Sequence, residues 1–97
     1  MPKSFASAHL IDMCGLLGLN LDELCEYVVK PNPGKIAVQR KIEGAVISVS
    51  KQHKHKLRNE RTLLNKVVHD PELSHLKNIG GPTTSVAQIL LSATSEL

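Results

Sequence analysis

Aromatic residues are almost missing from this chain, which has one Phe, one Tyr and no Trp among 97 residues. Proteins that bind single-stranded nucleic acid usually stack bases on several aromatic side chains, so the composition argues against that class. A core without aromatic rings must be built from Leu, Ile and Val, and this favours helices packed on helices. We therefore expect one small all-α domain.

Cysteines and long apolar runs are also scarce. Cys14 and Cys25 are the only cysteines, too few for a disulfide framework or a zinc-finger site, and their apolar surroundings predict reduced core thiols. The sequence has no signal-peptide pattern and no apolar run long enough to span a bilayer. We expect a soluble intracellular protein without a membrane partner.

Motifs for catalysis and for metal binding are lacking. The segment Gly80-Gly81-Pro82-Thr83 has no phosphate-loop Lys, and no nucleophile elbow occurs, so we expect neither an enzyme nor a cofactor. His53 and His55 are two residues apart on a predicted helix and are flanked by lysines, so no metal is expected there. His53 and Glu60 fall in the apolar sector of that helix, where they could pair across a helix interface.

Charge is segregated along the chain, although the formal net charge is only +3. Residues 12–26 are acidic, whereas residues 51–66 hold six Lys or Arg against the single Glu60. Such segregation favours a polyanionic partner.

Residues 35–68 contain no proline and only one glycine, Gly44, and are predicted to form one long helix. On a helical wheel, five cations share a narrow sector opposite an apolar seam. These cations are Arg40, Lys51, Lys54, Arg58 and Arg61. From Arg40 to Arg61 the stripe would span roughly 32 Å, which suits the phosphates and 2′-hydroxyls of a duplex read by shape. Further hydrogen bonds are predicted at its edges from Ser48, His55 and Thr62.

A β-hairpin is the alternative for residues 35–50. Residues 36–38 and 45–49 are rich in β-branched side chains, and Glu43-Gly44 could turn between them. The opposed apolar and basic faces, which continue past Ser50, favour the helix.

The N-terminal part of the chain reads as a helical segment that pairs with the long helix as a hairpin. Residues 4–18 predict a helix, and Asn20 with Glu23 resembles a capping box before a second stretch. The apolar series continues across Gly18, so residues 4–30 could form one bent helix or two. The Pro31-Asn32-Pro33-Gly34 segment predicts a turn.

After the long helix, Asp70-Pro71 predicts a stop, and residues 71–76 predict a short third helix. Residues 78–82 predict a hinge. Residues 85–88 form a second capping-box pattern at the start of a short terminal helix. We therefore expect a helical binding and dimerisation domain over residues 1–78 and a C-terminal tail over residues 79–97.

Residues 36–64 resemble, without a gap, the long helix of the small double-stranded-RNA-binding silencing suppressors of nodaviruses. Arg40, Lys51 and Arg58 match the basic RNA-contacting positions of that family's helix. Residues 58–64 are similar to its end, and residues 70–76 are similar to the short helix that follows it.

The resemblance implies an antiparallel homodimer in which paired helices form a four-helix bundle. It also implies sequence-independent binding of double-stranded RNA, which shields duplexes from Dicer and sequesters small interfering RNAs in the host cytoplasm. The implied partners are double-stranded RNA, a second copy of the chain, and Dicer or other silencing components.

Two other functions are consistent with the sequence. A DNA-binding regulator would use residues 21–49 as an irregular helix-turn-helix, although the loop with two prolines argues against it. A protein-interaction module would instead present the basic face to an acidic partner.

Overall fold

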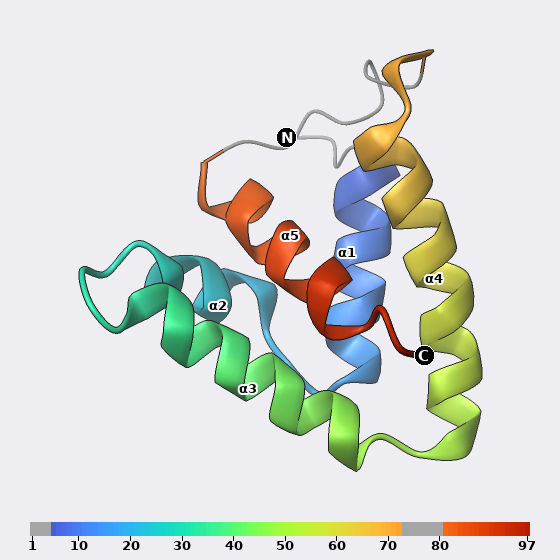
Figure 1. Cartoon of the computed structure of the whole chain (residues 1–97), viewed down its shortest axis with the longest axis horizontal. Coiled ribbons are helices and arrows are strands. Elements are labelled where there is room, and N and C mark those ends of the chain that lie inside the picture. Colours follow the sequence, from blue (N-terminus) through green and yellow to red (C-terminus); the bar gives the residue numbers. More distant parts are fainter. Residues whose placement is uncertain (1–4, 73–80) are drawn as a thin grey trace.

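The computed structural model describes residues 5–72 and 81–97, and these residues form helices and no strand. The all-α prediction is therefore confirmed, and the β-hairpin alternative for residues 35–50 is wrong. The helices, in chain order, are α1 (Phe5–Leu16), α2 (Leu21–Val28), α3 (Gly34–Ser48), α4 (Lys51–His69) and α5 (Pro82–Ala93) (Figure 1). Within the described ranges, none of these helices combines the length and apolarity needed to cross a membrane.

Two separate helices, α1 and α2, occupy the N-terminal segment that the sequence left undecided. Gly18 has a φ of 71°, and the Leu19 N–H donates to the Cys14 carbonyl at 2.8 Å. A left-handed glycine with this hydrogen bond is the Schellman motif that ends helices. Asn20 then caps α2, because its side chain accepts from the Glu23 N–H at 3.1 Å. The predicted cap at Asn20 is confirmed.

The predicted single helix over residues 35–68 is wrong, because the chain breaks between α3 and α4. Val49 (ψ 145°) and Ser50 (ψ 160°) are extended, and the Ser50 hydroxyl accepts from the His53 N–H at 3.2 Å to begin α4. An unbroken helix over 35–68 would be about 50 Å long. The molecule measures only 34 × 33 × 22 Å, so the break lets both segments bury their apolar sides in one core.

The break also changes the predicted pairing of helices. The long second helix of the expected hairpin does not form: α4 packs along α1, whereas α3 packs on α2 and α5. Figure 1 shows α3 and α4 running in different directions from the corner where they join, and Ser50 caps α4 at this junction. A four-helix bundle built on one continuous basic helix per copy is therefore not available to this chain.

Helix α5 is part of the core. Its buried residues are Val86, Ala87, Leu90 and Leu91. They meet side chains from all four other helices in one cluster that includes Leu10, Val28, Ile42 and Leu64. The short terminal helix predicted from the sequence is therefore confirmed, and it packs on α2 and α3.

The start of α5 differs from the prediction. The helix begins at Pro82 after Gly81, whose φ is 54°, and no side chain caps it. Proline suits the first turn of a helix because its missing N–H would have no partner there. The capping box predicted at Ser85 is therefore wrong, since Ser85 already lies inside the helix. The predicted stop at Asp70 is confirmed, while the short helix over 71–76 falls mostly outside the described residues.

Candidate nucleic-acid interface

Helix α4 has a buried side and an exposed basic side. Leu57, Leu64 and Val67 are buried toward α1 and the core. Six exposed polar side chains occupy a sector of about 80° on the other side, at 100° per residue. We call five of them the α4 strip: Lys51, His55, Arg58, Thr62 and Lys66. The sixth is His69, the last residue of the helix. From Lys51 to Lys66 the strip extends about 22 Å along the helix.

The only acidic residue of α4, Glu60, lies away from the strip. Its carboxylate contacts the His9 ring across the α1–α4 interface, where the two side chains are 25% and 13% exposed. The predicted pairing of Glu60 across a helix interface is confirmed, whereas His53, predicted to do the same, is exposed. Because Glu60 is held on the inner side, no carboxylate of α4 neutralises the cations of the strip.

The structure does not bring the eight predicted RNA-contacting residues into one line. Lys51, His55, Arg58 and Thr62 belong to the α4 strip. Arg40 and Ser48 are exposed on α3, which runs in another direction, so they do not extend it.

Two of the predicted cations lie at the side of α4 that turns toward the core. Lys54 and Arg61 are half-buried, and an Arg61 guanidinium N–H donates to the Leu91 carbonyl of α5 at 3.1 Å. This contact ties α4 to the end of α5 and takes Arg61 out of the exposed surface. Arg61 is therefore placed for packing between helices.

Lys66 belongs to the α4 strip but is not among the residues predicted from the sequence. The predicted sector was centred on cations from both α3 and α4, and this placed Lys66 outside its edge. A wheel drawn for residues 51–69 alone, opposite Leu57, Leu64 and Val67, would have included it. The Thr62 hydroxyl donates to the Arg58 carbonyl at 2.9 Å, so its oxygen remains a hydrogen-bond acceptor.

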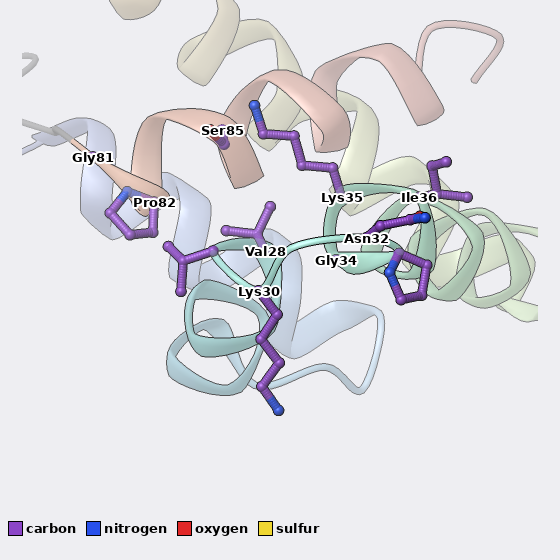
Figure 2. Close-up of a pocket in the computed structure, with 11 residues that line it drawn as sticks. Val28, Lys30, Asn32, Gly34, Lys35, Ile36, Gly81, Pro82 and Ser85 are labelled. Carbon is purple, nitrogen blue, oxygen red and sulfur yellow. The ribbon is translucent and has the colours of Figure 1, made fainter.

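A second surface feature, a hollow of about 670 Å³, lies between the α2–α3 turn and the start of α5. Val28, Gly34 and Pro82 line it together with two lysines, Lys30 and Lys35. Figure 2 shows the lysine side chains extending in opposite directions, so they do not converge on one ligand. The α4 strip is the stronger candidate site for an anionic partner.

Comparisons with protein-family models, with curated proteins and with solved structures give no match to this chain.

Proposed function

We propose that this chain is a binding protein, not an enzyme, that holds double-stranded RNA without reading its sequence through the α4 strip. The observation that carries the proposal is the orientation of α4. The helix packs on α1 by its apolar side, turns its one carboxylate to His9, and exposes Lys51, Arg58 and Lys66 together.

The shape of the strip favours a duplex over other anions. A straight row of about 22 Å exceeds what a small phosphate ligand could occupy, and it matches successive backbone phosphates along a groove. Contacts to phosphates position a protein on a duplex but carry no sequence information. Thr62 and His55 offer hydrogen-bonding groups between the cations, and these suit the 2′-hydroxyls that distinguish RNA from DNA.

We further propose that two copies pair antiparallel, so that two strips act on one duplex. Four of the five large hydrophobic residues exposed in the described part of the chain lie on α2, on α3 or beside them: Tyr27, Val29, Ile36 and Ile47. Pairing of two α2–α3 units in a four-helix bundle would bury part of this exposed apolar surface.

Charge complementarity supports a second copy as the occupant of this surface. Helix α2 exposes Asp22, Glu23 and Glu26, whereas α3 exposes Lys35, Arg40 and Lys41. In a two-fold symmetric pair the same patch meets itself, so the acidic helix of one copy can face the basic helix of the other.

A protein of this kind would act in RNA silencing by occupancy. Duplexes covered by the paired strips would be shielded from Dicer, and small interfering RNAs would be sequestered in the host cytoplasm. The resemblance of residues 36–64 to the long helix of nodavirus suppressors suggests this biological role, but the chain departs from that helix at Ser50. The role therefore rests on RNA binding by α4.

The test compares two charge reversals of the same residue type. Arg58→Glu alters the α4 strip, whereas Arg40→Glu makes the same charge change on α3. Gel shifts at moderate salt would use a blunt RNA duplex, a second RNA sequence, the matching DNA duplex and each single strand. We expect Arg58→Glu to lose about tenfold or more in affinity, because a hydrogen bond between charged groups contributes about 1.5–3 kcal/mol. Arg40→Glu should lose much less when its molecular mass in solution is unchanged, because Arg40 lies outside the α4 strip but on the surface proposed for pairing.

The outcomes separate the proposals. Equal loss in both variants, with unchanged molecular mass in solution, would favour a continuous stripe over the α4 strip. Loss of mass in Arg40→Glu would assign its effect to pairing. Preference for the DNA duplex would indicate a regulator, and weak binding to every probe would leave an acidic protein as the partner.

A further inference from the structure

Three side chains with metal-binding atoms meet where α1 packs on α4, apart from the α4 strip. His9 and Asp12 are three residues apart on α1, which places them on one helix face, and Glu60 reaches them from α4. A ring nitrogen and two carboxylate oxygens, one ligand atom from each residue, all lie within 4.8 Å of one another. Figure 1 shows α1 and α4 side by side, as this requires.

The donor set selects a class of ion. One imidazole nitrogen and two carboxylate oxygens suit zinc and similar first-row divalent ions, whereas calcium and magnesium prefer oxygen ligands alone. Ligand atoms about 2.1 Å from a tetrahedral zinc ion lie about 3.4 Å apart. Side-chain movements of about 1–1.5 Å, which would part the His9 and Glu60 atoms now in contact, would therefore place the three ligand atoms around an ion and leave a fourth position for water.

The surroundings admit and favour a cation. A hollow of about 620 Å³, lined by Asp12, Gly15 and Glu60, opens beside the cluster and connects it to solvent. Lys56 also lines this hollow, but the two carboxylates outweigh its single ammonium group. His9 and Glu60 are mostly buried, which limits competition from water for their ligand atoms.

We propose that His9, Asp12 and Glu60 form a binding site for a first-row divalent transition-metal ion, with zinc as the reference ion. The site joins residues that are 51 positions apart in the chain, so an unfolded chain cannot hold the ion in the same way. Metal binding should therefore stabilise the folded protein and clamp α1 to α4. Sequence patterns alone do not reveal this site, because only the packing of α1 on α4 brings Glu60 to the other two ligands.

The test is a calorimetric titration of the full chain with zinc chloride, together with thermal unfolding with and without a chelator. Asp12→Asn and Glu60→Gln each remove one ligand oxygen's charge at nearly constant shape. His53→Ala is the matched control, because His53 lines the same hollow without belonging to the cluster. Asp12 is exposed, so its variant should fold normally even if Glu60→Gln weakens the packing on α1.

We expect one zinc ion per chain, a higher unfolding temperature with zinc, and reversal by the chelator. Asp12→Asn and Glu60→Gln should weaken zinc binding at least about tenfold, since even residues that only orient metal ligands typically contribute that much. His53→Ala should bind zinc as the unmodified chain does. The absence of saturable zinc binding would overturn the proposal and leave His9–Glu60 as a structural pair. Equal affinity of Asp12→Asn and the unmodified chain would overturn it too.

Discussion

Two glycines on α3 should respond in opposite directions to the same substitution. Gly34 begins the helix, and a Cβ atom there would lie 2.9 Å from the Tyr27 carbonyl oxygen and 3.2 Å from that of Val28. Gly44 lies inside the same helix, and a Cβ atom there would meet nothing within 4 Å. The two positions therefore differ in the space around the new methyl group.

The magnitudes follow from these distances. Gly44→Ala should stabilise the fold by about 1 kcal/mol, because alanine is favoured over glycine by about that amount inside a helix. This gain corresponds to a rise of about 4–8 °C in the unfolding temperature of a small domain. Gly34→Ala should destabilise by about 1–3 kcal/mol, the usual cost of forcing an extra carbon into filled space. Here the neighbouring atoms are backbone oxygens, which cannot rotate away.

Urea unfolding followed by circular dichroism, at two protein concentrations, gives both free energies of unfolding. A free energy of unfolding that changes with protein concentration would report a contribution from pairing through α3. Neither glycine lies on α4, so RNA affinity per folded molecule should be unchanged. Stabilisation by Gly34→Ala, or destabilisation by Gly44→Ala in the monomer, would refute the packing described for α3.

Three further predictions concern other parts of the fold. Ser50→Ala should cost about 1 kcal/mol and speed amide exchange at the start of α4, because the Ser50 hydroxyl caps that helix; unchanged exchange would contradict the cap. Arg61→Ala should destabilise the fold by loss of the hydrogen bond to Leu91, yet reduce RNA affinity far less than Arg58→Glu in the gel shift. Burial, helped by nearby Cys25, raises the pKa of Cys14 from 9.0 to about 12. The neutral thiol is thus favoured in the folded state, so the stability advantage over Cys14→Ala should hold below pH 9 and shrink as the pH rises toward 12, which urea titrations at several pH values would measure.

Local signals in the sequence predicted much of the fold correctly. Asn20 and Asp70 mark real helix boundaries because a side-chain cap and a following proline act on the nearest turn of chain. The apolar surroundings of Cys14 also identified it correctly as a core residue. These features depend on neighbours within a few residues, which is the range that a periodicity argument covers.

The break at Ser50 could not be read in the same way. No proline or glycine marks it, and the Ser50–His53 pair lacks the Glu or Gln of a capping box. The apolar positions Val46, Leu57 and Leu64 keep nearly the same phase through it. The packing of α4 on α1 decides the break, and that contact joins segments about 50 residues apart. A contact between distant segments also gives Arg61 and Arg58 different roles. The hydrogen-bond partner of Arg61 lies on α5, and the sequence near Arg61 does not indicate this.

The salt dependence of RNA binding reports how many cations contact the phosphates of the duplex. The break at Ser50 fixes the number to expect, because it separates the cations of α3 from those of α4. For B-form DNA, each neutralised phosphate contributes a slope of about −0.9 in a plot of log affinity against log salt concentration, and we use this value for the RNA duplex. One α4 strip, with Lys51, Arg58 and Lys66, should therefore give a slope of about −3, and two strips in a dimer about −5. A continuous five-cation stripe would give about −4.5 per chain and about −9 per dimer. A slope steeper than about −6 for the unmodified protein would thus refute the α4 strip as the whole RNA-binding surface, whatever the affinity.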